Sequence, residues 1–423
     1  MPPIISTLLT SFTNIALRSR VRDDDVIDQL NHWATVGLLF ALAMGTGAKQ
    51  YVGDPIHCWV PAVYSKKHYQ QYSDSYCWIH PMYNVPFEDQ LPYDEQDRWY
   101  NDLGYYRWVF IVFLIQAFLF YFPYMVWQQM KNYSGLNVTK IVGMALDTSM
   151  LTQDKRDEKM GHIAHFMDRW LLTYSQYKYN ALTNFRDKCS RVMFCFGKRS
   201  GTYLSGLYMF IKLLYFANVI GQFFLLSSFL DINFWTFGIK AMETFGKKGR
   251  WQDHHTFPRV GFCDYKIRQL YNLQTFTVQC VLSINLFLEK MYLIFWFWLV
   301  ILLAFNTVNL IQWILRSIVP SIGGNFLSKY SILLKLNTAS EKKLFRKFVG
   351  QYLKTDGVFV MRIVSANIGD MLTLDLVNHL WKQYKDKYTL KDDVAASPGR
   401  NGGLASPSAP DIDDDTIPPK KVD

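Results

Sequence analysis

Four long apolar runs interrupt an otherwise polar chain of 423 residues. Residues 29–48, 108–130 and 291–315 contain no Asp, Glu, Lys or Arg, and the run 203–230 contains only Lys212. A helix needs about 20 apolar residues to cross the hydrocarbon core of a bilayer, and each run reaches that length. The pattern predicts an all-α membrane protein with four transmembrane helices, at residues 29–50, 105–130, 203–230 and 289–316.

The segments outside these runs differ in character. Residues 1–28 carry an amphipathic pattern that predicts a short helix before the first span. Residues 131–202 and 317–391 mix apolar and charged positions at helical spacing but are too polar to cross a bilayer, so they predict a helical dome. Residues 392–423 are rich in Pro, Gly, Ser and Asp, which predicts a disordered tail. The remaining segments are loops, at residues 51–104 and 231–288.

Lys and Arg are unevenly distributed among these segments. Residues 50–103 contain three basic side chains against eight acidic ones, whereas residues 131–202 contain twelve against six and residues 316–423 contain sixteen against twelve. Because cytoplasmic segments are enriched in Lys and Arg, the last two segments and both chain ends are predicted to be cytoplasmic. Residues 231–290 are an exception, since they contain eight basic side chains against five acidic ones. A chain with four spans and cytoplasmic ends nevertheless places this segment outside the cell. The net charge of +10 reflects this topology and predicts no nucleic-acid partner.

The cysteines provide a second indication of topology. Each predicted outer loop contains one pair, Cys58 with Cys77 and Cys263 with Cys280, and disulfides persist in oxidising compartments. Cys58 and Cys280 each lie about ten residues from a predicted span, near the membrane. We therefore favour the pairs Cys58–Cys280 and Cys77–Cys263, which would join the outer loops. One bridge within each loop is the alternative.

No catalytic, metal or cofactor site is predicted. Cys189 and Cys195 fall in the predicted cytoplasmic loop, where free thiols are expected, and the nearby His162 and His165 do not complete a zinc-ligand spacing. The chain has no GxSxG, HExxH, P-loop or Gly-rich dinucleotide motif. These observations argue against an enzyme.

Several motifs in this order resemble those of the innexins. The motif Tyr105-Tyr106-Arg107-Trp108, at the start of the second span, is similar to their YYQW signature, with arginine where glutamine is usual. The other similar segments are CWVP at 58–61, YCW at 76–78, the second outer loop with the fourth span at 257–298, and a cytoplasmic segment at 352–370. The resemblance extends from about residue 1 to residue 390.

The resemblance implies a function in cell junctions. Innexins form hemichannels, reported as octamers around a central pore in the plasma membrane, and two hemichannels on apposed cells dock to make a gap junction channel for ions and small molecules. The implied partners are further copies of this chain or other innexins, together with membrane lipid. Two alternatives remain open. One is an undocked hemichannel similar to the pannexins, and the other is a four-span adhesion or scaffold protein without a pore.

The resemblance also implies that residues 1–28 form a funnel at the pore mouth and that the first span lines the pore. The resulting pore-lining candidates are Ile4, Leu8, Phe12, Gly37, Ala41 and Gly45. Small residues in the first span also permit close helix packing, which is the alternative interpretation of the last three.

Charged residues near the spans allow more than one interpretation. Asp23, Asp24 and Asp25 either form an acidic ring that attracts cations to the pore or cap the helix that follows them. Lys212 is a functional candidate because charges inside membrane spans are rare. It either serves the pore, pairs with an acid, or extends its side chain toward the membrane surface.

Overall fold

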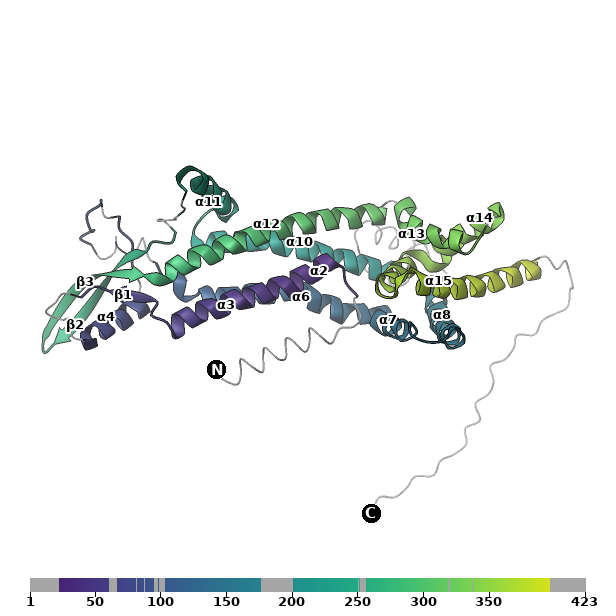
Figure 1. Cartoon of the computed structure of the whole chain (residues 1–423), viewed down its shortest axis with the longest axis horizontal. Coiled ribbons are helices and arrows are strands. Elements are labelled where there is room, and N and C mark those ends of the chain that lie inside the picture. Colours follow the sequence, from purple (N-terminus) through teal and green to yellow (C-terminus); the bar gives the residue numbers. More distant parts are fainter. Residues whose placement is uncertain are drawn as a thin grey trace, which may run out of the picture.

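Long apolar helices run side by side through the middle of the molecule, with a β-sheet beyond one end and shorter helices beyond the other (Figure 1). We call these the sheet end and the helical end. The computed structural model describes residues 23–60, 67–80, 82–86, 88–94, 98, 103–175, 201–249, 251, 256–318, 320–336 and 338–395. Ile4, Leu8 and Phe12 of the predicted funnel therefore lie outside the described residues.

The central bundle consists of α3 (Thr35–Tyr51), α6 (Val109–Lys131), α10 (Tyr203–Leu230) and α12 (Ser283–Ile318). Among the described residues, four helical stretches are long and apolar enough to cross a membrane, namely Val109–Ser134, Tyr203–Leu230, Ser283–Arg316 and Ala339–Lys387. The first three overlap the predicted second, third and fourth spans. Together with the disulfides described below, they agree with the predicted class of helical membrane protein.

The predicted first span is helical throughout but changes its winding near the start. The short helix α2 (Val26–Gln29) leads into a π-helical turn, η1 (Leu30–Ala34), and then directly into α3. Because this turn divides the segment, α3 has only 17 residues and is not among the four long apolar stretches. The helical segment as a whole packs along α6 and also contacts α12.

The fourth long apolar stretch lies at the helical end instead of in the bundle. It is divided into α14 (Ala339–Lys347), the π-helical η6 (Phe348–Leu353) and α15 (Lys354–Ala395), and Gly369 interrupts α15 with a φ of 79°. The helix α15 packs against α7 (Val138–Leu146) and α8 (Gln153–Ser175), which covers much of its apolar surface. It also continues past residue 391, where the disordered tail was predicted to begin.

A carboxylate fastens the helical end to the bundle. Asp356, near the start of α15, accepts hydrogen bonds from the backbone N–H groups of Leu204 (3.2 Å) and Ser205 (3.0 Å) at the start of α10. The first N–H groups of a helix have no partner within the helix, and an acidic side chain is favourable there. Asp356 therefore caps α10 from a distant part of the chain. The short helix α13 (Pro320–Leu333) connects α12 to this region.

The sheet end contains three antiparallel strands that the sequence analysis did not predict. The strands β1 (Ile56–Cys58), β2 (Val260–Gln269) and β3 (Asn272–Leu282) are arranged in the order β1-β3-β2. Along β3, buried Val278, Cys280 and Leu282 alternate with more exposed residues, as expected for a strand with one covered face. The helix α4 (Lys67–Ile79) contacts β1 and β2.

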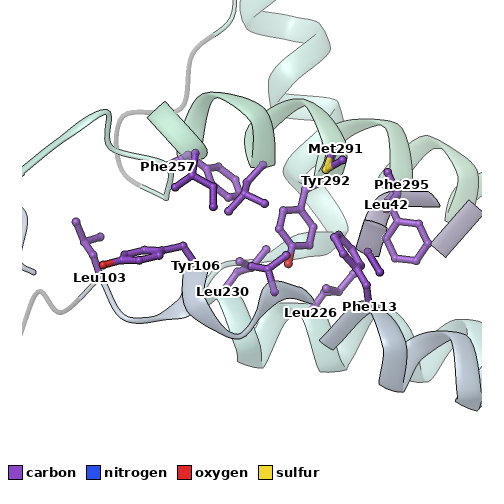
Figure 2. Packing of buried hydrophobic residues seen from close by; sticks show 14 of the residues in the cluster. Leu42, Leu103, Tyr106, Phe113, Leu226, Leu230, Phe257, Met291, Tyr292 and Phe295 are labelled. Carbon is purple, nitrogen blue, oxygen red and sulfur yellow. The ribbon is translucent and has the colours of Figure 1, made fainter. Parts of the chain in front are cut away.

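The bundle is packed largely by aromatic side chains near the sheet end. Figure 2 shows Tyr292 of α12 between Phe113 of α6 and Leu226 of α10, and all three side chains are buried. The ring centroids of Tyr292 and Phe113 are 5.4 Å apart. Aromatic pairs at such distances add to the stabilisation from burial, so this region is a well-defined junction of three helices.

Beyond this junction, α11 (Phe234–Lys248) lies against α12 through a glycine. A Cβ atom on Gly238 would come within 2.1 Å of the Trp296 ring, and Trp296 Nε1 donates a hydrogen bond to the Phe234 carbonyl (2.9 Å). The indole occupies the space that any side chain at position 238 would need. Gly246, on the same helix, has no atom within 4 Å of such a Cβ.

The substitution Gly238→Ala is expected to separate α11 from α12. Overpacking of this kind costs about 1–3 kcal/mol, so the thermal unfolding temperature of the detergent-solubilised protein should fall. The matched control Gly246→Ala should be neutral or stabilising, because alanine favours helix formation over glycine by up to about 1 kcal/mol. Equal effects of the two substitutions would contradict the packing described for Gly238.

Candidate pore-lining face and its charged anchor

We call the continuous segment α2–η1–α3 (Val26–Tyr51) the first helix; one of its faces, rich in small residues, is left uncovered by the described residues. Between residues 31 and 50 its exposed positions are Trp33, Ala34, Gly37, Ala41, Met44 and Ala48, so four small residues are exposed together with the large side chains of Trp33 and Met44. The opposite face is buried against the bundle, where Leu39 is 0% exposed and Ala43 is 1% exposed. Two of the predicted pore-lining residues, Gly37 and Ala41, therefore lie on the uncovered face.

Gly45 has a different environment from the other two candidates. A Cβ atom on Gly45 would lie 2.9 Å from Met291 Cε and 3.5 Å from Phe287 Cζ, both on α12. Gly45 is half-buried and lets α12 approach the first helix closely. For this residue, the structure favours the helix-packing interpretation over a place in a pore lining.

The three consecutive aspartates are directed into their own subunit. Asp23 forms a buried ion pair with Lys131 at the end of α6. Asp24 accepts a hydrogen bond from Gln29 Nε2 (2.9 Å), and burial raises the pKa of its carboxyl to about 7 against the lowering effect of that hydrogen bond. Asp25 is the residue that precedes α2. The Asp23 and Asp24 side chains are therefore held within the bundle, whereas the Asp25 side chain is 41% exposed.

Asp25 adopts the position of a helix N-cap. Its backbone is extended, and its N–H group donates to Asp28 Oδ2 (3.3 Å), three residues further on. An acid at the third helical position that accepts from the N-cap backbone is one half of a capping box. Of the two interpretations of Asp25, the structure favours the cap.

Lys212 of α10 is the centre of this cluster of charges. Its Nζ atom lies 2.8 Å from Asp28 Oδ1 and 3.0 Å from Asp25 Oδ2, and its side chain is 3% exposed. The Tyr208 hydroxyl donates to Asp28 Oδ2 (2.7 Å), and Trp313 Nε1 donates to Asp25 Oδ2 (2.7 Å). Lys212 therefore pairs with acids and does not extend to the membrane surface. We call Lys212, Asp25 and Asp28 the charged anchor.

The charged anchor joins three helices at one point, because Lys212 belongs to α10, the two acids flank the start of the first helix, and Trp313 belongs to α12. A lysine ammonium is costly to remove from water and is tolerated only when its hydrogen-bonding capacity is satisfied by acids and other acceptors. The start of the first helix is therefore fixed to the bundle by the requirement that Lys212 keep its partners.

A pair of amides lies one helical turn further along. Asn31 Nδ2 donates to Asn306 Oδ1 (2.9 Å), and Asn306 Nδ2 donates back to Asn31 Oδ1 (3.0 Å). Both residues are buried, and Trp298 Nε1 donates to Thr35 Oγ1 (2.9 Å) nearby. The sequence analysis did not single out these residues. The signal was Asn306 itself, a polar residue within the apolar run of the fourth span.

At the sheet end, two disulfides join segments far apart in sequence. Cys58 is bonded to Cys280 and Cys77 to Cys263, with Cα–Cα distances of 3.9 and 5.8 Å. The first bond links β1 to β3 and the second links α4 to β2, so each disulfide connects the two loops. The Sγ atoms of Cys58, Cys77 and Cys280 lie within 4.8 Å of one another, but disulfide sulfurs are not thiolate ligands for a metal.

A partly buried ion pair holds the same sheet to residue 98. Arg98 donates to Asp264 Oδ2 (2.8 Å), and the Tyr83 hydroxyl donates to Asp264 Oδ1 (3.1 Å). Burial, with the adjacent Asp264 carboxylate, raises the pKa of Tyr83 to about 12.

Comparison with known proteins agrees with this architecture. A family model described as Innexin matches residues 24–384. The chain belongs to the innexin family. Innexin unc-9 of Caenorhabditis elegans is 35% identical over 364 residues, which cover 86% of this chain and 93% of that protein. Innexin-3 of Caenorhabditis elegans is 34% identical and covers 85% of this chain and 84% of that protein. Innexin-19 of Caenorhabditis briggsae is 32% identical, with 90% of both chains covered.

In this innexin, the family motif connects the second span to both loops of the sheet end. The Tyr105 hydroxyl donates to the Thr256 carbonyl (2.8 Å), and Tyr106 is fully buried with its ring centroid 5.0 Å from that of Trp78. Arg107 donates to the Ile79 carbonyl at the end of α4. Trp108 is 59% exposed on the outer surface of α6.

Arginine at position 107 therefore has a defined structural contact, although glutamine is usual there. Its guanidinium reaches a backbone carbonyl of the first loop. From the neighbouring helix, Gln50 Nε2 donates to the Tyr106 carbonyl (2.6 Å), so the motif is also tied to the first span.

Cys189 and Cys195, predicted to be free thiols, lie outside the described residues.

The substitution Lys212→Met is expected to destabilise this innexin strongly. Removal of the ammonium leaves Asp25 and Asp28 without their cation, and breaking a buried pair from one side costs about 3–5 kcal/mol. Thermal unfolding of the detergent-solubilised protein measures the effect. The control Lys247→Met breaks an exposed pair with Glu243 and should have little effect.

A second variant distinguishes the loss of charge pairing from the loss of packing. The double substitution Lys212→Met with Asp28→Asn should recover part of the stability, because it removes one of the two unpaired carboxylates. A double variant less stable than Lys212→Met alone would contradict the assigned pairing.

Proposed function

We propose that this innexin is a subunit of a gap junction channel. Subunits assemble around a central pore as a hemichannel, and two hemichannels on apposed plasma membranes dock so that ions and small molecules pass between the cells. Membership of the innexin family supports the assignment to gap junctions. The observation that carries the pore proposal is the uncovered face of small residues on the first helix.

Small side chains suit a pore wall for a physical reason. A bundle that encloses a wide lumen must present at least one helix face that packs against nothing, and glycine and alanine leave the largest free cross-section there. The opposite face of the same helix is buried against α6 and α12. The first helix, over Val26–Tyr51, is thus proposed as a span and as the pore wall.

The proposed orientation puts the sheet end outside the cell and the helical end in the cytoplasm. Both disulfides lie at the sheet end, and disulfides persist in the extracellular environment. The excess of Lys and Arg in residues 131–202 and 316–423 supports a cytoplasmic helical end. Docking through the sheet end follows from this orientation, with further copies of this chain or other innexins as partners. An octameric hemichannel is the stoichiometry proposed from the family resemblance.

Two further functions from the sequence analysis are tested alongside this proposal. An undocked hemichannel would have the same pore but would release small molecules from single cells. A four-span adhesion or scaffold protein would have no pore, and the small-residue face would then contact a neighbouring helix.

Cysteine substitutions at matched alanines test the pore face. In a background with Cys189 and Cys195 replaced by serine, Ala41→Cys should react with a water-soluble thiol reagent, and the current should fall. Ala43→Cys should be unaffected, because Ala43 is 1% exposed and faces the bundle. If the reagent reduces the current of neither variant, or only that of Ala43→Cys, this face is not the pore wall.

Recording from paired cells tests the docked channel. Cells that express only this innexin should show junctional current and transfer of a small dye. Cys58→Ser should abolish both, because it removes the bond between β1 and β3. Currents in single cells without coupling between pairs would assign the protein to the undocked alternative. Correct delivery to the cell surface with no current in either arrangement would favour the scaffold.

A further inference from the structure

Two arginines from different helices lie against one indole ring at the helical end of the bundle. The guanidinium carbon of Arg316, on α12, is 5.5 Å from the centroid of the Trp313 ring, and that of Arg362, on α15, is 5.8 Å from it. Arginines favour such positions because the guanidinium plane is attracted to an aromatic face. Helices far apart in sequence thus bring two positive charges to the same ring.

Within the part of the chain that the structure describes, neither arginine is neutralised by a carboxylate. Among the described residues, no carboxylate forms an ion pair with Arg316 or Arg362, and neither guanidinium has a hydrogen-bond partner. Asp25 acts on Arg362 electrostatically but is already paired with Lys212. Burial lowers the pKa of Arg362, and repulsion from Arg316 lowers it further. Both side chains are half-buried, so this excess of positive charge is only partly solvated.

A further aromatic ring and a further cation lie next to the two arginines. Arg362 also lies 5.1 Å from the ring centroid of Phe326, and Lys329 covers the same ring at 4.7 Å. Lys329 differs from the arginines because it pairs with Asp370 at 2.6 Å. Of the three cations here, two therefore have no carboxylate partner among the described residues.

The position along the bundle indicates the source of a matching anion. Arg316 lies near the end of α12 (Ser283–Ile318), the most apolar part of which precedes it. The preceding turn exposes Ile311 and Leu315, which are 51% and 49% exposed. Where an apolar helix face gives way to Trp and Arg, the side chains lie at the depth of lipid headgroups.

We propose that Arg316 and Arg362 bind a phosphate group, with Trp313 and Phe326 holding the two guanidinium groups in place. Each guanidinium can donate two parallel hydrogen bonds to phosphate oxygens, which is the geometry that distinguishes arginine from lysine. The phosphate belongs either to the headgroup of an anionic phospholipid or to a soluble phosphate compound. The proposed phosphate site adjoins the charged anchor. The Trp313 ring that the two arginines contact also donates a hydrogen bond from Nε1 to Asp25 Oδ2.

Titration of the purified full-length protein in detergent tests this site. Three probes are used: a short-chain phosphatidylinositol 4-phosphate, a short-chain phosphatidylcholine and inorganic phosphate. The phosphatidylinositol phosphate should bind saturably and more tightly than phosphatidylcholine, whose phosphate is offset by choline. The readout is a dissociation constant, so it does not depend on whether the chain forms a channel.

Matched variants assign the binding to the two arginines. The double substitution Arg316→Gln with Arg362→Gln should weaken binding by about ten-fold or more, the loss expected from hydrogen bonds to charged groups. Arg362→Lys keeps the charge but loses the forked geometry, and should weaken binding less. Lys342→Gln with Lys343→Gln removes the same charge from the exposed surface of α14 and should leave binding unchanged.

The outcomes separate the source of the phosphate from the existence of the site. Tight binding of the lipid alone supports a headgroup site, and equal binding of inorganic phosphate supports a site for soluble phosphate, provided that the arginine variants reduce it. Equal affinity for phosphatidylcholine, unchanged binding in the double arginine variant, or an equal loss in the lysine variant would each overturn the proposal. Gel filtration checks the fold, and Arg316→Gln alone replaces the double variant if that variant aggregates.

Discussion

A lysine ammonium without access to water constrains the arrangement of the whole bundle. Lys212 lies within the third long apolar run, and its charge is tolerated only because Asp25 and Asp28 approach it from the first helix. The acids are in turn held by hydroxyl and indole groups of α10 and α12. Any displacement of the first helix along the bundle would separate the charges. The ionic requirement thus fixes the register of the helix whose opposite side is proposed to form the pore wall.

The two ends of the first helix are held by different kinds of bond. At the sheet end, Gln50 donates to the backbone of the family motif, and β1, which follows the helix, is bonded covalently to β3. At the helical end, ion pairs and hydrogen bonds replace the disulfides. Aromatic packing around Tyr292 fills the region between them. With both ends held and one side packed, the helix needs no support on the face of small residues.

Features that depend on neighbouring residues could be predicted from the sequence, whereas contacts between distant residues could not. The family and the helical membrane class were confirmed, because long apolar runs and ordered motifs are local features. The partners of Lys212 were not predictable, since Asp25 and Asp28 are 187 and 184 residues away from it. The strands at the sheet end were not predicted, because buried and exposed residues alternate only in the later part of β3, while its first four residues are all exposed. For Gly45 the sequence left both a pore lining and close helix packing open, because the approach of Met291 from a distant part of the chain is not visible in the local sequence.

The distance along the chain between bonded cysteines has a consequence for biosynthesis. Cys58 and Cys280 are separated by 222 residues, and Cys77 and Cys263 by 186. With the sheet end outside the cell, as proposed, neither bond could form until the second loop had been translated and moved across the membrane of the endoplasmic reticulum, after insertion of three spans. During that interval the cysteines of the first loop stand beside each other with no correct partner. An oxidoreductase that delays or reverses a Cys58–Cys77 bond would therefore determine how much of the newly made protein matures.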